Sequence, residues 1–325
     1  MQNKLKIIFA GTPDFAVPVF KALLADADFE IAAVITQEDK PVGRKQTLTP
    51  PPVKVVAQEF NLKIFQPDKI KNIKDEIAAL KPDFIVVVAY GQIIPQNILD
   101  IPKYGCVNVH ASLLPRWRGA AVIQAPILAG DAETGVTIMK MDAGLDTGPI
   151  IAQMKINILK NETAETLHDE LAKLGAQMLP ETLKSFARSE MELKKQDDKL
   201  ATYARRLTKE DGKIDWTKSA AEIERMVRAY APWPGAFGQT KDKRACPRTR
   251  DAAREELRIV KILEVENTIL PINKFKIGEI FLVDGELTVQ CGEGALVINK
   301  LQLEGGKPMS AEEFLRGHAD FVGTI

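Results

Sequence analysis

Cysteine and histidine are scarce in this chain. The 325 residues include only three of each, widely separated: Cys106, Cys246, Cys291, His110, His168 and His318. Spacings this wide give neither a disulfide framework nor the clustered ligands of a zinc site. We therefore expect no bound metal. The lack of a disulfide framework favours a cytoplasmic location.

Long apolar runs and an excess of one charge are also missing. The strongest apolar run, 84–90, is far shorter than the roughly 18 residues of a membrane span. The run 5–10 is too short for a secretory signal. The 44 basic and 44 acidic residues cancel, which argues against indiscriminate polyanion binding but allows a local basic surface. We expect no membrane partner.

Three common motifs of nucleotide and nucleophile chemistry are absent. The turn after the first apolar run holds one glycine, Gly11, where a dinucleotide-binding fingerprint has three. The sequence contains no P-loop and no Gly-x-Ser-x-Gly motif. A dehydrogenase, a kinase and a serine hydrolase are all disfavoured.

The first half of the chain alternates short apolar runs with amphipathic stretches. Strands are expected at 5–10, 31–35, 62–65, 84–90, 106–109, 135–139 and 150–156, and helices at 15–24, 53–60, 73–80 and 163–188. Apolar strands separated by helices predict an α/β fold with a mostly parallel sheet covered on both faces. Thr12 is expected to cap the first helix, and residues 36–49 are expected to form a polar loop.

The character of the chain changes after residue 189. Residues 190–206 are polar and are interpreted as a linker. A helix at 220–228 and short strands at 258–264, 278–283, 287–291 and 295–301 follow. Short strands at this spacing, punctuated by glycine, predict a small antiparallel barrel. We therefore expect one domain over residues 1–189 and a second over 207–325.

Polar side chains collect at the ends of two predicted strands. Asn108 and His110 are two residues apart, so they face the same side of one strand at its carboxyl end. Open α/β sheets bind their ligands at that end. Asp146 lies 36 residues beyond His110, in a turn-rich loop after the strand that ends near Met139. The carboxyl ends of the two strands are expected to bring these three side chains together.

An amide, an imidazole and a carboxylate suit acyl transfer to an amine. Asn and His side chains can donate hydrogen bonds to the oxyanion of a tetrahedral intermediate. A neighbouring carboxylate favours the protonated imidazole and can relay the proton that the attacking amine loses. On spacing alone a histidine at a strand end is more often structural, so both interpretations stay open at this point.

The residues around His110 and Asp146 resemble a known family. Gly-Cys-Val-Asn-Val-His110-Ala-Ser-Leu-Leu-Pro-Arg-Trp-Arg-Gly and Gly-Val-Thr-Ile-Met-Lys-Met-Asp-Ala-Gly-Leu-Asp146-Thr-Gly are similar to segments of the folate-dependent formyltransferases. The resemblance is narrowed to members that act on a charged initiator tRNA by the segments 8–16, 41–54, 214–216 and 223–237. The similarity covers residues 4–237 closely and the remainder loosely.

The resemblance implies a fold and an activity. The fold is a Rossmann-like formyltransferase domain followed by an OB-like β-barrel domain that holds tRNA. The activity is transfer of a formyl group from 10-formyltetrahydrofolate to methionyl initiator tRNA for translation initiation. We separately expect a monomer. Asn108, His110 and Asp146 match the catalytic trio. The implied folate-binding residues are Ala89, Tyr90, Gly91, Ser112, Leu113, Leu114 and Pro115.

Contacts with tRNA are expected in two basic segments. By the resemblance, Arg44 reaches the acceptor end of the tRNA, and Lys45 follows it. Residues 205–258 carry fourteen Lys and Arg against nine Asp and Glu, and include Lys241, Lys243 and Arg244. Such a patch could neutralise phosphates, although a charged run is also consistent with a solvated face.

Three alternative functions remain. A formyltransferase acting on a nucleotide-linked amino sugar would use the same trio without Arg44. A hydrolase that releases formate from the same folate would replace the amine by water. A non-catalytic RNA-binding protein would leave the trio unexplained. Two departures from the family are Val122, where proline is frequent, and the long basic segment 238–256, where a short hairpin turn is expected.

Overall fold

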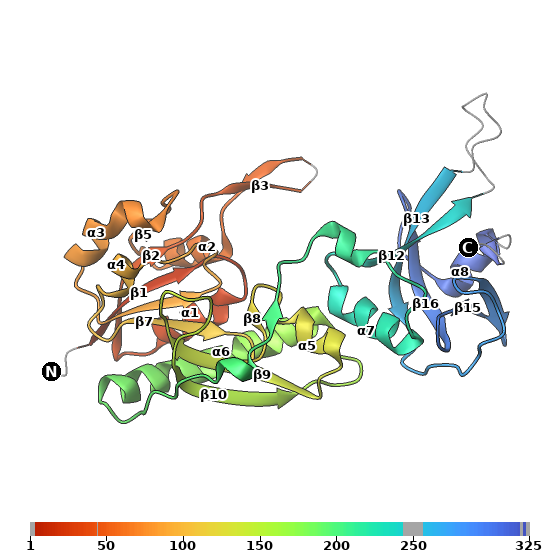
Figure 1. Ribbon diagram of the computed structural model, residues 1–325. Coiled ribbons are helices and arrows are strands. Elements are labelled where there is room, and N and C mark those ends of the chain that lie inside the picture. The colour runs from red at the N-terminus through yellow and green to blue at the C-terminus, as the bar shows by residue number, and fades with distance from the viewer. Residues whose placement is uncertain (1–3, 44, 243–255, 319–320, 323–325) are drawn as a thin grey trace. The chain divides into compact units, whose positions relative to one another are not determined.

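The computed structural model describes residues 4–43, 45–242, 256–318 and 321–322, without the side chains of 241–242 and 256–257. These residues form two compact units (Figure 1). As far as it is described, the first unit comprises Met1–Val122, Glu133–Asn157 and Leu167–Arg205, and the second comprises Ile123–Ala132, Ile158–Thr166 and Arg206–Ile325. No helix in the described part of the chain is long and apolar enough to cross a membrane.

A seven-stranded sheet forms the centre of the first unit. Its strand order is β10-β9-β7-β6-β1-β2-β5. The strands are β1 (Leu5–Gly11), β2 (Phe29–Ile35), β5 (Ile64–Phe65), β6 (Phe84–Val88), β7 (Cys106–His110), β9 (Glu133–Lys140) and β10 (Ile150–Asn157). The strands from β7 to β5 are parallel, whereas β9 is antiparallel to both neighbours. The predicted α/β fold with a mostly parallel sheet is confirmed.

The central strands of this sheet are fully buried. Every residue of β6 and of β7 is buried, so both faces of these strands are covered. Ile8 of β1 and Ile85 of β6 share one core cluster with Ile77. The mainly apolar runs 84–88 and 106–110 therefore correspond to strands with no face toward solvent.

The helical elements of the first unit lie between these strands or follow the last of them. They are α1 (Ala16–Ala25), α2 (Pro52–Glu59), the 3-10 turn η1 (Ile70–Ile73), α3 (Lys74–Ala79), α4 (Gln96–Leu99), α6 (Ala164–Ala187) and the 3-10 turn η2 (Asp198–Leu200). The first residues of α6 belong to the second unit. The prediction that Thr12 caps α1 is wrong. The N-cap is Phe15, and Thr12 Oγ1 instead donates to the carbonyl oxygen of Tyr90 at 2.9 Å, which ties the end of β1 to the residues after β6.

The segment predicted as a polar loop contains a hairpin. β3 (Lys40–Val42) pairs antiparallel with β4 (Thr47–Thr49), and Lys40 lies opposite Thr49. All residues of both strands are exposed. No alternation of buried and exposed positions therefore marks these strands in the sequence.

A second short pairing joins two segments that were expected to be a loop and a linker. β8 (Arg118–Gly119) pairs in parallel with β11 (Tyr203–Ala204). Lys194 also pairs with Ile150 at the start of β10. The stretch Leu167–Arg205 belongs to the first unit, so residues 190–205 pack against the fold that holds His110.

The second unit is built on antiparallel strands. Their order is β12-β13-β16-β15-β14, and β17 pairs with β16. The strands are β12 (Ala236–Asp242), β13 (Glu256–Val265), β14 (Ile280–Val283), β15 (Glu286–Gln290), β16 (Ala295–Leu303) and β17 (Met309–Ser310). The helical elements are α5 (Gln124–Ala129), the 3-10 turn η3 (Lys209–Gly212), α7 (Ala220–Tyr230) and α8 (Ala311–Gly317). All the strand pairings are antiparallel, which confirms the predicted antiparallel β domain.

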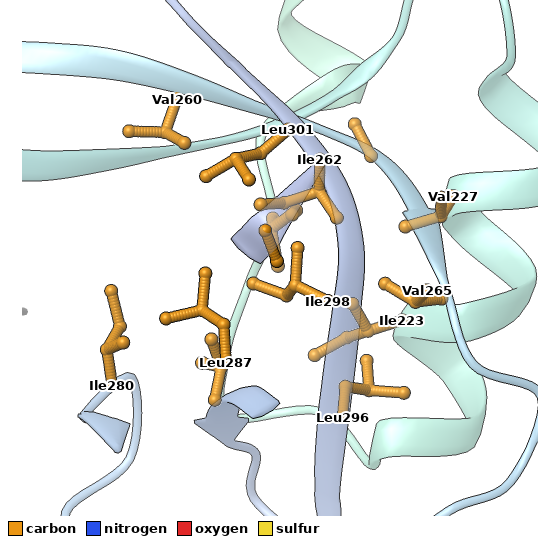
Figure 2. Packing of buried hydrophobic residues seen from close by; sticks show 14 of the residues in the cluster. Ile223, Val227, Val260, Ile262, Val265, Ile280, Leu287, Leu296, Ile298 and Leu301 are labelled. Carbon is orange, nitrogen blue, oxygen red and sulfur yellow. The ribbon is translucent and has the colours of Figure 1, made fainter. Parts of the chain in front are cut away.

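Helix α7 helps to close the core of this unit (Figure 2). Its residues Ile223 and Val227 are buried in one cluster with Ile262 of β13 and Ile298 of β16. The apolar positions of α7 are four residues apart, which places them on one helix face. The amphipathic pattern of α7 therefore fixes the face that packs on the sheet.

Candidate active site

His110 ends β7 and is almost completely buried, with 6% of its surface exposed. Its Nε2 lies 3.0 Å from the carbonyl oxygen of Trp117. Because a carbonyl oxygen only accepts hydrogen bonds, Nε2 carries the proton of this contact. The other ring nitrogen, Nδ1, lies 3.8 Å from Oδ1 of Asp146. The imidazole is therefore held from one side and faces a carboxylate on the other.

Asp146 reaches His110 by a route that the sequence analysis did not predict. We expected the carboxyl ends of two strands to meet at one edge of the sheet. Because β9 is antiparallel to β7, Lys140 at the end of β9 lies opposite Val107 at the start of β7. The backbone N–H of Met141 donates to Cys106. The loop 141–149 must therefore fold back along β7 for Asp146 to come within 3.8 Å of the ring.

The Asp146 carboxylate is held by the backbone of β8. The N–H of Gly119 donates to Oδ2 of Asp146 at 2.8 Å. This leaves Oδ1 as the oxygen that faces His110. Asp146 itself has a φ of +54°, in the left-handed region that non-glycine residues rarely adopt. A strained backbone at a polar, half-buried carboxylate is typical of functional sites.

Asn108 precedes His110 by two residues in β7 and is also buried. Strand alternation places it on the same side of the sheet as His110. Within the part of the chain that the structure describes, no hydrogen bond is found for its side-chain amide. Asn108 is 9% exposed, and its amide is not among the fully buried polar atoms that lack a partner in the described ranges. The amide therefore reaches the surface and is available to a ligand.

The segment after β7 that is predicted to bind folate has a backbone held by hydrogen bonds, and some of its side chains are exposed. The N–H of Leu114 donates to Thr137 Oγ1 at 3.1 Å, and Ser112 Oγ donates to the carbonyl oxygen of Arg116 at 2.7 Å. Ser112 and Leu114 are buried, whereas Leu113 and Pro115 are partly exposed. Only the latter two side chains can touch a ligand without rearrangement.

The residues after β6 form a backbone turn. Ala89 and Gly91 are exposed and have positive φ angles of +47° and +87°. Tyr90, between them, is buried in the core cluster that contains Ile8, and its hydroxyl has no hydrogen-bond partner among the described residues. Burial raises the pKa of Tyr90 to about 12. The turn therefore offers peptide groups, not the tyrosine ring, to a ligand.

The second carboxylate of the loop has a local role. Asp142 is exposed, and its Oδ1 accepts from Thr147 Oγ1 at 2.6 Å and from the N–H of Gly144 at 3.1 Å. These bonds close the turns of the loop. Two aspartates of similar sequence context are thus distinguished by what they contact.

The residues expected to contact tRNA are described only in part. Lys45 is exposed beside the β3–β4 hairpin. Lys241 lies in β12, and its side chain is not described. Arg44, Lys243 and Arg244 lie outside the described residues.

Two residues at the site were missed by the sequence analysis. Gln196 is buried, and its Nε2 donates to the carbonyl oxygens of Asp146 and Gly148 at 2.8 and 2.7 Å. Arg118 is 2% exposed, and its Nη2 donates to Gln196 Oε1 at 2.9 Å. Burial acts to lower the pKa of Arg118, but hydrogen bonds to Asp198 and Tyr203 outweigh it and raise the pKa overall. Nothing in the polar segment 190–205 marks Gln196 in the sequence.

Thiol and metal chemistry find no support among the described residues. Burial raises the pKa of the Cys106 thiol to about 12, so this cysteine is a packing residue beside β7. No group of three or more His, Cys, Asp and Glu side chains in the described ranges could hold a metal ion.

Comparison with known proteins gives matches over nearly the whole chain. A formyl transferase family model matches residues 4–183, and a formyl transferase C-terminal domain model matches residues 206–319. The methionyl-tRNA formyltransferase of Geobacter sulfurreducens is 45% identical over 323 residues, which is 98% of this chain and 96% of that protein. The Pseudomonas fluorescens (strain Pf0-1) protein of that name is 44% identical over 331 residues, covering 100% of this chain and 97% of its own.

A solved structure shares the fold at much lower identity. The N-formyltransferase from Helicobacter canadensis, in complex with folinic acid and dTDP-3-aminofucose, superposes with a TM-score of 0.63. It is 20% identical and covers 90% of this chain and 98% of its own. At this identity the likeness concerns the fold alone.

Proposed function

The chain belongs to the methionyl-tRNA formyltransferase family, and from this premise we propose that it transfers the formyl group of 10-formyltetrahydrofolate to the amino group of methionyl initiator tRNA. The observation that supports the chemistry is the pairing of His110 with Asp146, 3.8 Å apart and brought together from two separate segments. The choice of tRNA rests on relatives that are similar over the full chain.

The side chains of β7 would stabilise charge during the transfer. When bound, 10-formyltetrahydrofolate would supply the formyl carbon that the amine attacks. The bond from this carbon to N10 would then break, and tetrahydrofolate would leave with a proton on N10. The Asn108 amide, for which no hydrogen bond is found among the described residues, would donate to the oxyanion that develops on the formyl oxygen. His110 would add positive charge next to it while keeping its hydrogen bond to Trp117.

Asp146 would act on both the imidazole and the amine. Its Oδ1 faces His110 Nδ1, so it stabilises a proton on that nitrogen. Its Oδ2 is fixed by the N–H of Gly119. A carboxylate held in this way can take part in removing the proton that the attacking amine must lose. No covalent intermediate with the protein is needed.

The residues proposed to bind folate fit a flat, polar ring system. The exposed peptide groups of Ala89 and Gly91 provide the donors and acceptors that such a ring requires. The partly exposed Leu113 and Pro115 provide apolar contact. Three buried side chains would contribute to folate binding only by fixing the backbone around them: Tyr90, Ser112 and Leu114.

The second domain and the β3–β4 hairpin would hold the tRNA. Arg44 and Lys45 are proposed to contact its acceptor end. Lys241, Lys243 and Arg244 are proposed to contact its phosphates. We further propose a monomer in the cytoplasm with a catalytic domain over residues 1–189, a linker over 190–206 and an OB-like tRNA-binding domain over 207–325.

A parallel assay of three products tests the function. Purified protein and 10-formyltetrahydrofolate are mixed with methionyl initiator tRNA, with a nucleotide-linked amino sugar, or with no amine. We expect formyl transfer to the tRNA, little transfer to the sugar and little free formate. The variants His110→Ala and Asp146→Ala should each lower turnover by about 100-fold or more.

His168→Ala is the matched control. His168 also lies beside carboxylates, with Nδ1 2.9 Å from Asp169 and Nε2 3.4 Å from Asp14, but is not part of the site. It should keep near-normal turnover. Preferred transfer to the sugar or predominant formate release would contradict the substrate. Near-normal rates in the His110 or Asp146 variant would contradict the mechanism.

A further inference from the structure

The segment 196–204 holds the loop that carries Asp146. Gln196 is 5% exposed, and its Nε2 uses both of its hydrogens on that loop. One goes to the carbonyl oxygen of Asp146 at 2.8 Å and the other to that of Gly148 at 2.7 Å. The backbone on either side of Thr147 is thereby fixed by a single amide.

Arg118 fixes the orientation of that amide. Its Nε and Nη2 donate to Gln196 Oε1 at 3.1 and 2.9 Å. Because Oε1 is occupied by a guanidinium fork, Nε2 must point at the Asp146 loop. Arg118 is in turn held by Asp198, 2.8 Å from Nη2. Arg118 is the largest of the fully buried side chains in the described ranges, which restricts its motion.

Strand β8, which contains Arg118, also holds the carboxylate of Asp146. Gly119, next to Arg118 in β8, donates its N–H to Oδ2 of Asp146 at 2.8 Å. β8 is fixed against β11 by the N–H of Arg118, which donates to the carbonyl oxygen of Thr202 at 2.8 Å. A Cβ at Gly119 would lie 2.6 Å from the carbonyl oxygen of Ala204, so only glycine allows this approach. Gln196 and Gly119 therefore hold both the backbone and the side chain of Asp146 by hydrogen bonds.

These hydrogen bonds stabilise a strained conformation of Asp146. The φ of +54° at Asp146 is strained and persists only where the surroundings enforce it. If these hydrogen bonds were lost, the loop 141–149 would relax and Oδ1 of Asp146 would move away from His110. A displacement of about 1 Å at a reacting group can cost about 100-fold in rate.

We propose that Gln196 and Arg118 are positioning residues that hold Asp146 in its working conformation beside His110. This inference rests on the proposed function, because it assigns Asp146 a part in the transfer. It makes the segment 196–204, which the sequence predicts to be a linker, a structural part of the active site.

Gln196→Glu tests the proposal with almost no change in shape. A carboxylate still accepts from Arg118, but its second oxygen meets the carbonyl oxygens of Asp146 and Gly148 where an N–H2 donated before. We expect kcat to fall by about 10- to 100-fold. We expect the KM for 10-formyltetrahydrofolate and for methionyl initiator tRNA to change by less than about twofold, since Gln196 is almost completely buried.

Gln290→Glu is the matched control for a purely structural loss. Gln290 is 1% exposed, and its Nε2 donates to the carbonyl oxygens of Ile272, Cys291 and Gly294 in the second unit. The same substitution there should lower the melting temperature and leave kcat within about twofold. If Gln196→Glu behaves like this control, with reduced stability and unchanged kcat, the proposal is wrong.

A double-variant comparison separates positioning from an independent effect. In an Asp146→Ala background, Gln196→Glu should lower kcat by no more than about twofold, because Gln196 acts through Asp146. Multiplicative losses would overturn the proposal. Should Gln196→Glu fail to fold, Arg118→Lys takes its place, since lysine keeps the charge beside Asp198 but lacks the fork that orients Gln196. An inactive wild-type protein would overturn the proposed function and this inference together, whereas an active wild type with a fully active Gln196→Glu would overturn this inference alone.

Discussion

Tyr90 was predicted to bind folate, but its side chain is buried and has a structural role. Its ring is 1% exposed, and its hydroxyl is buried with no hydrogen-bond partner among the described residues. An unpaired buried hydroxyl costs about 1 kcal/mol or more. Replacing it by hydrogen removes that cost and keeps the packing of the ring.

We therefore expect Tyr90→Phe to raise the free energy of unfolding by about 1 kcal/mol at pH 7. The gain should grow above pH 10. Between the ordinary value of 10.0 and the folded-state pKa of about 12, the unfolded tyrosine loses its proton while the folded one keeps it. The unfolded state then binds fewer protons, so wild-type stability falls as pH rises. Urea unfolding at pH 7, 9 and 11 measures both effects.

The same variant tests the proposed folate contact. If only the backbone around Tyr90 meets the folate, the KM for 10-formyltetrahydrofolate should stay within about twofold of wild type. A large rise in that KM, or a loss of stability at pH 7, would mean that the hydroxyl has a partner in the working enzyme.

At this scale the sequence shows residue types but not their partners. His110 and Asn108 stand out because strand alternation puts them on one side. Asp146 could be preferred over Asp142 only through the family resemblance, since both lie in one loop; their contacts tell them apart. Gln196 could not be found, because its role depends on a loop 48 residues away along the chain.

Among the elements, α7 has a start that can be tested by substitution. Ser219 is its N-cap: Ser219 Oγ accepts from the N–H of Glu222 at 3.3 Å, and the Glu222 carboxylate accepts from Ser219 in return. Hydrogen bonds from the hydroxyl and then the backbone N–H of Ser219 hold the pKa of Glu222 below its ordinary value of 4.5. The reciprocal bonds satisfy donors that the first turn of a helix leaves open.

Ser219→Ala should lower the free energy of unfolding by about 1 kcal/mol at pH 7. The loss should be smaller at pH 3. A carboxylate whose pKa is lowered stabilises the fold fully above pH 4.5, and that part is lost as the pH falls below this value. Denaturant titrations at the two pH values measure the difference, and Ser219→Thr, which keeps the acceptor oxygen, is the control. An equal or larger loss at pH 3 would contradict the reciprocal capping.

Element prediction succeeded where burial leaves a pattern and failed where it does not. Strand β6 follows directly from an unbroken apolar run, and β1 and β7 follow from mainly apolar runs. The β3–β4 hairpin is exposed throughout, and β8 and β11 are two residues long, so neither has a readable period. The reversed direction of β9 depends on which strand it pairs with, which periodicity does not contain.

The whole molecule combines a net charge of zero with an uneven distribution of charge. The 44 basic and 44 acidic residues balance, yet residues 205–258 carry fourteen Lys and Arg against nine Asp and Glu. A protein of this kind can bind tRNA through a local surface while the rest of the chain adds no general attraction for polyanions. The KM for tRNA should therefore depend on salt concentration much more than the KM for the folate does.

We expect the KM for methionyl initiator tRNA to rise about 10-fold or more between 50 and 200 mM KCl, as two or three phosphate contacts require. The KM for 10-formyltetrahydrofolate should change by less than about threefold. In the triple variant Lys241→Gln, Lys243→Gln and Arg244→Gln, the slope of log KM for tRNA against log salt should flatten by about one for each phosphate that is no longer neutralised. Steady-state kinetics at four salt concentrations give both slopes.

The charge-matched control for this variant is a triple change of the exposed Lys69, Lys71 and Lys74 to Gln in the first unit. It alters the net charge equally, so it should shift the tRNA slope far less if direct phosphate binding and not overall charge decides affinity. Equal slopes in the two triple variants would assign the salt dependence to net charge. A wild-type KM for tRNA that is insensitive to salt would remove the basic segment from the binding surface altogether.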